Sequence, residues 1–298
     1  MDNALKFAVI GGDRRMIEVI RIISAKGLSV KVWGIDEKYV ESSICVEGCE
    51  DAVRGADIVI LPTPTSEDDV RINCPLFSKE SGIKMHKMLD MLKKDAMVFG
   101  GRMSPRLREY IAQRGLKSFD YFNKDELLVK NAVPTAEGAI GIAIEKMPRM
   151  LLGSKIAVLG FGRIGEALSS RLKLLGANVT VYARKSLCIA KAQSDGYNGV
   201  KIEFNNGESS LMELTTKGYH LIYNTVPHWI VTEDIVERLP KDTLFVDLAS
   251  APGGIDLVAA KKFEYEVVRA PSLPSKVAPV SAGEIIAESI FNIIEEEL

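Results

Sequence analysis

The feature that most constrains this chain is a glycine pattern at residues 160–165, whose sequence is GFGRIG. An apolar run at 155–159 precedes it, and a helical pattern follows from Glu166 to Leu175 and stops at Gly176. Between a strand and a helix, this spacing is typical of a dinucleotide-binding turn. The first glycine permits the tight turn, the second leaves room for a pyrophosphate, and the third lets the helix pack closely on the strand.

The start of the following helix would supply free N–H groups and a partial positive charge to the phosphates. Two alternatives remain for the same pattern: a tight turn that binds nothing, and a related fold that binds another nucleotide. The predicted contacts with the pyrophosphate are Gly160, Gly162, Arg163, Ile164 and Gly165.

Short β-rich runs alternate with helical patterns along the whole chain, which predicts βαβ units and parallel sheets. With 298 residues, the chain is long enough for two domains. We therefore predict an α/β protein with two Rossmann-like, doubly wound parallel-sheet domains and a cleft between them. Strands are expected at 6–10, 30–35, 57–61 and 96–99, and then at 155–159, 179–182, 221–223, 244–246 and 266–268.

The two domains are expected to be joined by two crossings. Residues 131–134 should be extended, because the residue before Pro134 avoids the α region, and an Ala- and Gly-rich helix should then run to Lys146. The last helix should begin at Ser281, which opens a capping-box pattern. The expected domains are residues 1–130 plus 281–298, a substrate or partner domain, and 131–280, an NADP-binding domain.

Composition excludes several classes of protein. Hydrophobic residues make up 47% and charged residues 26%, which is ordinary for globular proteins. The net charge is −2, so no general basic surface exists to hold a nucleic acid or a membrane. No apolar run of 18 or more residues is present, so we expect no membrane-spanning helix. The sequence enters a strand almost at once, without a secretory leader, so we expect a cytoplasmic protein.

Cysteine and histidine patterns give little sign of a metal site. Cys45 and Cys49 form a C-x3-C pair, but no second pair with zinc-ligand spacing follows. The four cysteines are too few for a disulfide scaffold, and the three histidines are scattered. We predict free thiols and no metal.

The end of the second strand of the later series should contact the adenine ribose. NAD enzymes carry Asp or Glu there, but this chain carries Arg184, Lys185 and Ser186. A guanidinium would pair with a 2′-phosphate, so we predict NADP, with NAD as the alternative; a solvated basic strand end is the simpler interpretation. Further cofactor contacts are expected at later strand ends: Asn224, Thr225, Val226, Pro227, Asp247 and Ser250.

The turn after the first strand, Gly11-Gly12-Asp13, resembles the later one but lacks its third glycine. Asp13 would place a negative charge where a phosphate should lie. We therefore expect no second dinucleotide site there, and expect these strand ends to face the substrate.

Ligands of open α/β sheets lie beyond the carboxyl ends of the strands. Hydroxyl and cationic side chains at those positions favour a small carboxylate as the substrate, although such residues also cap strands and helices. The predicted substrate-binding residues are Asp13, Thr63, Thr65, Arg102, Thr135, Ser275 and Lys276.

Two residues are candidates for the proton-transfer base. His228 follows a strand end near the expected nicotinamide, and an imidazole can take a proton near neutral pH. It could equally be an exposed loop residue beside Trp229. Glu137 is the second candidate, but a carboxylate in the first turn of a helix is also favourable for the dipole alone.

An ordered set of segments over essentially the whole chain resembles one family, the A subunit of dipicolinate synthase. Two positions depart from the family pattern: Ser275, where relatives carry glycine, and His228, where relatives carry an apolar or small residue. The segments that carry the resemblance are Val9–Arg14, Pro134–Gly138, Gly160–Gly165, Asp247–Ser250, Pro252–Asp256 and Leu273–Pro279.

The resemblance implies an NADP-dependent oxidation of dihydrodipicolinate to dipicolinate, pyridine-2,6-dicarboxylate, in the mother-cell cytoplasm of a sporulating bacterium. It also implies a second, flavoprotein-like subunit. The family's cofactor contacts would fall on Gly160, Gly162, Arg163, Ile164 and Arg184, and no established catalytic base carries over.

Two other functions remain open. One is a 2-hydroxy-acid dehydrogenase, which usually carries a catalytic histidine late in the cofactor domain, whereas no histidine follows His228 here. The other is a non-catalytic NADP-binding partner of the second subunit. We also expect self-association, as a dimer, because proteins of this architecture tend to form dimers.

Overall fold

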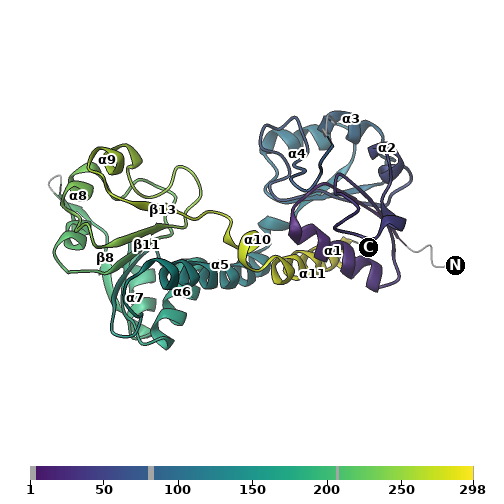
Figure 1. Cartoon of the computed structure of the whole chain (residues 1–298). Helices are drawn as coiled ribbons and strands as arrows, with labels where there is room; N and C mark the ends of the chain where they lie inside the picture. The colour runs from purple at the N-terminus through teal and green to yellow at the C-terminus, as the bar shows by residue number, and fades with distance from the viewer. Residues whose placement is uncertain (1–4, 80–83, 206–207, 298) are drawn as a thin grey trace. The chain divides into compact units, whose positions relative to one another are not determined.

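The computed structural model describes residues 5–79, 84–205 and 208–297. The chain forms two compact units: unit 1 contains the described residues of 1–131 and 278–298, and unit 2 contains 132–277 (Figure 1). Each unit has a parallel β-sheet covered by helices on both faces. This confirms the predicted α/β class with two doubly wound domains.

Unit 1 contains a five-stranded parallel sheet in the order β2-β1-β3-β4-β5. The last strand was not predicted, because it lies at the sheet edge and its sequence, KSFD, has no apolar run. The strands are β1 (Lys6–Ile10), β2 (Ser29–Trp33), β3 (Ile58–Ile60), β4 (Met97–Gly100) and β5 (Lys117–Asp120).

Helices cover both faces of this sheet. α1 and α11 lie side by side on one face, and α2, α3 and α4 cover the other (Figure 1). α11 approaches α1 closely at Gly283, where a Cβ would lie 2.5 Å from the Arg15 carbonyl oxygen. The helices are α1 (Arg14–Ala25), α2 (Cys49–Val53), α3 (Met85–Asp90), α4 (Pro105–Ala112) and α11 (Pro279–Glu297), with 3-10 turns η1 (Ser42–Ile44) and η2 (Tyr121–Asn123).

The predicted start of the last helix is wrong by two residues. α11 begins at Pro279, and the Ala282 N–H already bonds to the Ala278 carbonyl at 3.0 Å. Proline is favourable at the first helical position because its φ is fixed near the helical value and it has no N–H to leave unpaired. Ser281 therefore lies inside the helix and does not cap it.

The predicted extended segment at 131–134 is also wrong. These residues lie within α5 (Asp125–Lys146), which continues through Pro134. A proline inside a helix costs about 3 kcal/mol. Packing on both sides of the proline offsets that cost, since Leu127 is buried in the core of unit 1 and Ala136 and Ala139 in the core of unit 2.

Because Pro134 does not interrupt it, α5 is one helix of 22 residues that is long and apolar enough to span a membrane by length and composition alone. Half of its most apolar window is buried inside the protein. Core helices of soluble proteins have the same properties, so α5 is weak support for a membrane span.

Unit 2 contains a six-stranded parallel sheet in the order β13-β12-β11-β6-β7-β8. The chain goes from β6 outward to β8 and then returns to β11 on the other side, so the strand order reverses between β6 and β11. Dinucleotides bind at such a reversal. The strands are β6 (Lys155–Leu159), β7 (Asn178–Ala183), β8 (Asn198–Lys201), β11 (Leu221–Asn224), β12 (Leu244–Asp247) and β13 (Val267–Arg269), with a separate antiparallel pair β9 (Phe204–Asn205) and β10 (Glu208–Ser209).

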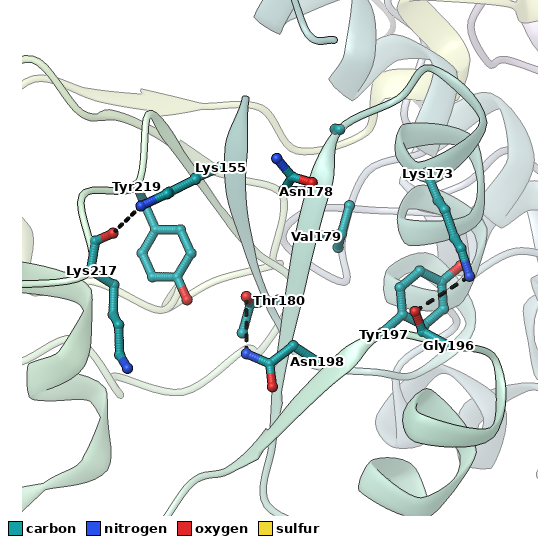
Figure 2. A pocket seen from close by; sticks show the side chains of 11 residues that line it. Lys155, Lys173, Asn178, Val179, Thr180, Gly196, Tyr197, Asn198, Lys217 and Tyr219 are labelled. Atoms are coloured by element: carbon teal, nitrogen blue, oxygen red, sulfur yellow. Dashed lines mark hydrogen bonds between the residues drawn. The ribbon is translucent and has the colours of Figure 1, made fainter. Parts of the chain in front are cut away.

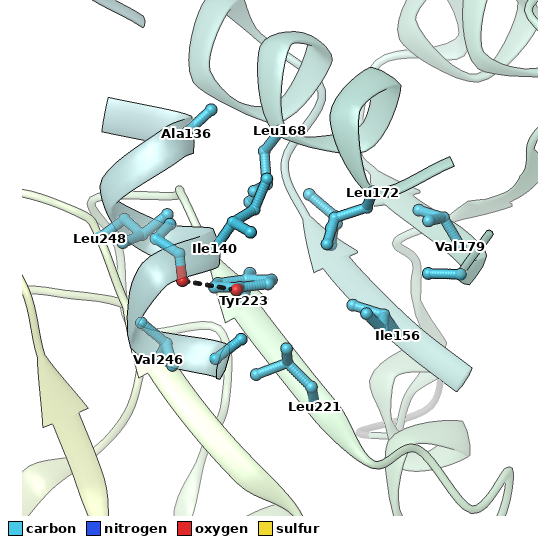
Figure 3. Packing of buried hydrophobic residues seen from close by; sticks show 14 of the residues in the cluster. Ala136, Ile140, Ile156, Leu168, Leu172, Val179, Leu221, Tyr223, Val246 and Leu248 are labelled. Carbon is cyan, nitrogen blue, oxygen red and sulfur yellow. Dashed lines mark hydrogen bonds between the residues drawn. The ribbon is translucent and has the colours of Figure 1, made fainter. Parts of the chain in front are cut away.

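The sheet of unit 2 is packed on both faces by apolar side chains. On one face, Ile140 of α5 and Leu168 and Leu172 of α6 pack against the strands (Figure 3). The Tyr223 hydroxyl donates to the Ala139 carbonyl at 2.7 Å and ties β11 to α5. The helices of this unit are α6 (Arg163–Leu174), α7 (Ser186–Ser194), α8 (Glu233–Arg238), α9 (Leu257–Lys262) and α10 (Leu273–Val277), with the 3-10 turn η3 (Ser210–Thr215).

Candidate cofactor and substrate sites

The glycine turn after β6 has the geometry that its sequence predicts. Gly160 has φ +96°, a conformation that L side chains rarely adopt, and a Cβ there would overlap the Thr225 hydroxyl. A Cβ at Gly165 would overlap the Gly160 carbonyl oxygen, so the third glycine lets α6 approach the turn. Apart from its chain neighbours, no atom of the described residues lies within 4 Å of a Cβ built on Gly162, which leaves open space beside the helix start.

The start of α6 has the features of an anion site. Gly162 is its N-cap residue and supplies no side-chain hydrogen bond to the first turn. A hollow of about 270 Å³ lies beside it, lined by both ends of the turn and by the loop after β11. Main-chain donors in an open hollow fit a pyrophosphate. The lining residues are Gly160, Gly162, Arg163, Ile164, Thr225, Val226 and Pro227.

The three residues after β7 are all exposed. Arg184, Lys185 and Ser186 follow the last strand residue and lead into α7, whose N-cap, Lys185, makes no side-chain capping bond. The neighbouring strand β6 carries the glycine turn. These side chains are therefore placed at the same sheet edge as the hollow, and two of them are cations.

Two predicted cofactor contacts need correction. Asn224 and Asp247 have no exposed surface, so their side chains cannot touch a bound cofactor. Instead, the Asn224 amide donates to Asp247 at 2.8 Å and to the Val226 carbonyl at 2.9 Å. They hold the ends of β11 and β12 in place. Thr225 lines the hollow, but its hydroxyl donates to the Leu159 carbonyl at 2.9 Å.

Sequence reasoning missed Arg269, the last residue of β13. Its Nη1 lies 2.5 Å from Asp247 Oδ2, and 28% of its side chain is exposed. The only hint in the sequence is the Gly253-Gly254 pair after β12, which signals a tight turn over that strand end.

In unit 1 the turn after β1 is closed. Asp13 caps α1 by accepting from the Arg15 N–H at 3.0 Å, and Arg15 Nη2 donates to Asp13 at 2.7 Å and to the Thr63 carbonyl at 2.6 Å. The Gly12 N–H donates to the Asn73 carbonyl at 2.9 Å. A protein carbonyl and a carboxylate thus already accept hydrogen bonds from N–H groups of this turn.

Thr63 and Thr65, predicted to bind substrate, are buried after β3. The Thr65 hydroxyl donates to the Pro62 carbonyl at 3.1 Å or to the Gly101 carbonyl at 3.2 Å. Thr65 has no exposed surface, so it supports the loop and cannot contact a ligand. The side chain of Thr63 is also enclosed, since a Cβ on Gly101 would overlap it.

Arg102 follows β4 and is an exposed cation at this edge of unit 1. Its backbone has φ +54°, and its N–H donates to Asp120 at 3.0 Å. Although the residue is exposed, its guanidinium lies over the Phe122 ring, 5.3 Å from the ring centre. Burial of the guanidinium, followed by the positive charge of Arg15, lowers the pKa of Arg102.

Two predictions on α5 also need correction. Glu137 lies in the middle of the helix, so the dipole of a first turn does not act on it. It is exposed, its Oε1 lies 3.8 Å from Arg171 Nε, and it does not line the hollow beside Gly162. Thr135 is buried inside the helix, which leaves little of it to contact a substrate.

The remaining predicted residues of unit 2 lie at the surface. His228, Ser250 and Lys276 are exposed, and Ser275 is half-buried with its hydroxyl donating to the Ser272 carbonyl at 2.9 Å. His228 directly follows Pro227, which lines the hollow. Of the two candidate bases, His228 is therefore nearer in the chain to the proposed cofactor site.

A second hollow of about 470 Å³ lies at the opposite edge of the same sheet, where β6, β7 and β8 begin (Figure 2). Two of its lysines are bound to main-chain carbonyls, Lys173 to Asp195 at 2.6 Å and Lys155 to Lys217 at 3.4 Å, and the third, Lys217, lies 3.8 Å from Glu213 Oε2. These cations are accounted for by their contacts at the ends of helices and loops, and the hollow lies away from the glycine turn. We assign it no part in cofactor binding.

Comparisons with known proteins agree with both units. Residues 6–122 match the family described as the N-terminal domain of the dipicolinate synthase A subunit. Residues 137–252 match the D-isomer specific 2-hydroxyacid dehydrogenase, NAD binding domain. Unit 2 is thus a nicotinamide-dinucleotide-binding domain of the oxidoreductase type.

The most informative relatives match the whole chain. The dipicolinate synthase A subunit of Bacillus subtilis (strain 168) is 31% identical over 99% of this chain and 98% of its own length. The crystal structure of the Bacillus subtilis protein superposes with a TM-score of 0.86, covering 99% of this chain and 97% of its own. The structure of the corresponding protein from Bacillus halodurans, 27% identical, gives the same TM-score over 97% of each chain. The chain belongs to the family of dipicolinate synthase A subunits.

Proposed function

We propose that this protein catalyses the NADP-dependent oxidation of dihydrodipicolinate to dipicolinate in the mother-cell cytoplasm of a sporulating bacterium. The observation that carries the proposal is the open glycine turn in a chain whose whole length is similar to a dipicolinate synthase A subunit. The name of that relative, one subunit of a synthase, supports a second subunit, which we propose to be flavoprotein-like. We also propose that the chain self-associates as a dimer.

For this reaction the protein mainly has to bind the substrate and the cofactor and orient them. The substrate loses a hydride from carbon and a proton, and the product is an aromatic ring. A bound nicotinamide cofactor supplies the hydride acceptor. The chain's own groups bind the pyrophosphate at Gly160–Gly165, pair with a 2′-phosphate at Arg184, and bind carboxylates.

For the base we propose His228 rather than Glu137. His228 is exposed and follows the loop that lines the cofactor hollow, whereas Glu137 is paired with Arg171 on a helix surface. A His228→Gln variant should retain NADP affinity and lose most of the turnover. A Glu137→Gln variant is the matched control, and it should change neither.

The decisive experiment supplies fresh dihydrodipicolinate and NADP to the purified chain, alone and with the second subunit, and follows NADP reduction. Reduction coupled to dipicolinate formation is the expected result. No reduction in either mixture would overturn the oxidoreductase proposal. Turnover of lactate or glycerate, with none of dihydrodipicolinate, would favour a 2-hydroxy-acid dehydrogenase.

A further inference from the structure

Arg269 is bound to Asp247, a carboxylate that several other groups also hold at the end of β12. Its Nη1 donates to Asp247 Oδ2 at 2.5 Å. Asp247 is fully buried and also accepts from the Asn224 amide at 2.8 Å and from the Ala249 and Gly254 N–H groups at 3.1 Å each. A carboxylate with four donors is rigid, so the guanidinium bound to it is rigid as well.

The turn after β12 is built to admit this arrangement. Gly253 has φ +92°, and a Cβ there would overlap Arg269 Nη1. A Cβ on Gly254 would overlap the Asn224 amide. Both glycines are therefore required for the turn to close over Asn224, Asp247 and Arg269, and any other residue would displace the network.

The Arg269 guanidinium has N–H donors that make no hydrogen bond within the described part of the chain. It carries five N–H groups, and its hydrogen bonds in the described part of the chain use Nη1 alone, to Asp247 and, at 3.5 Å, to the Pro252 carbonyl. Asp247 is inaccessible, whereas 28% of the Arg269 side chain is exposed. Nη1 is thus fixed to a buried carboxylate, and Nε and Nη2 can donate to a second anion bidentately.

The position of Arg269 fits a substrate contact. It ends β13, which pairs with β12, and β12 pairs with β11, whose following loop lines the cofactor hollow. Ligands of open α/β sheets lie at this carboxyl edge. We propose that Arg269 binds one carboxylate of the substrate and that Asp247 is its positioning residue. This rests on the proposed function, which supplies a dicarboxylate.

The test measures binding of dipicolinate and of picolinate, its one-carboxylate analogue, to the full chain saturated with NADP. Wild type should prefer dipicolinate by about tenfold or more, since charge-assisted pairs are among the stronger hydrogen bonds. Arg269→Gln should reduce that preference to about twofold, because only one carboxylate subsite would remain. Arg269→Lys should retain part of it, and Arg238→Gln, an exposed arginine of α8, should retain all of it.

The outcomes separate the two proposals. If wild type does not bind dipicolinate, the proposed function fails whatever Arg269 does. If wild type prefers dipicolinate and Arg269→Gln keeps the same preference, the role of Arg269 is overturned and the function stands. Arg269→Gln would fail to fold if the buried Asp247 charge were left without a counter-charge. In that case the double variant Arg269→Gln with Asp247→Asn removes the charge, and it should show the same twofold preference for dipicolinate over picolinate.

Discussion

The turns after β1 and β6 have N-cap residues with nearly the same backbone angles, but they differ in the preceding residue, where Gly12 has φ +111° and Phe161 has no positive φ, and in the groups that surround them. The N-cap residues Asp13 and Gly162 have φ and ψ of −98° and −168° and of −101° and −165°, respectively. In unit 1 the Asp13 carboxylate and the Asn73 carbonyl accept hydrogen bonds from N–H groups of the turn, and in unit 2 the space beside Gly162 is open. The same fold therefore makes a nucleotide site or a self-satisfied turn according to two or three residues.

Large and small side chains also occupy opposite positions in the two turns. Met16 lies where unit 2 has Gly165, and Gly12 lies where unit 2 has Phe161. Met16 and Phe161 are both buried in the cores of their units. A Cβ on Gly12 would overlap Met16, so the small residue makes room for the large one. The absent third glycine is thus compensated within unit 1, and its turn is well packed without a ligand.

The largest effect on NADP affinity is expected from a substitution that fills the open turn after β6. Gly162→Val places a branched side chain in the space beside the α6 start, and we expect NADP affinity to fall by at least about 100-fold, roughly 2.8 kcal/mol. The free energy of unfolding should fall by only about 1 kcal/mol, the cost of valine in place of glycine at an N-cap, because no atom of the described residues beyond its chain neighbours lies within 4 Å of that Cβ. Calorimetric titration with NADP and the urea midpoint measure the two effects. Unchanged affinity would remove the glycine turn from the cofactor site.

The reverse pattern is expected in unit 1. Gly12 has φ +111°, and a Cβ would overlap Met16, so Gly12→Ala should lower the free energy of unfolding by about 2 kcal/mol. NADP affinity should stay within about twofold of wild type. Urea unfolding of the variant beside Gly162→Val checks the contrast. Loss of NADP affinity in Gly12→Ala at full stability would mean that unit 1 binds the cofactor.

The sequence predicts the glycine turn well because the backbone itself demands those residues over six positions. It predicts poorly whatever depends on burial. Thr65 lies in the loop after β3 and Asn224 ends β11. At both places a polar side chain can either cap the loop or face a ligand, and only the packed structure shows that both are enclosed. The Arg269–Asp247 pair joins residues 22 apart in the chain, and no periodic pattern links them.

Helix α5 shows the same limit for secondary structure. Pro134 favours an extended neighbour locally, and that preference predicts a break. Burial of apolar side chains before and after the proline outweighs it. The short edge strands β5 and β8 escape prediction for the opposite reason, since their polar sequences carry little signal.

A moderate effect is expected at the strand end that follows the open turn. Arg184→Ala should weaken NADP binding by about tenfold, near 1.4 kcal/mol, and leave NAD binding unchanged, because only NADP carries the 2′-phosphate. Leu187→Ala is a control at an exposed position of α7, three residues further along the chain. Titrations with both cofactors give the ratio. An equal loss for NADP and NAD would mean that Arg184 does not recognise the 2′-phosphate.

The smallest effect concerns whether charge alone closes the turn of unit 1. Asp13→Ala removes the cap of α1 and the partner of Arg15, so we expect a loss of about 1 kcal/mol of stability. It should not create a second nucleotide site, because the Asn73 carbonyl still accepts the Gly12 N–H and Cys74 Sγ lies 2.5 Å from a Cβ built on Gly11. The stoichiometry of NADP binding by equilibrium dialysis should therefore equal that of wild type. An additional equivalent of NADP in the variant would show that the aspartate, rather than the segment at 72–74, is what excludes a phosphate from unit 1.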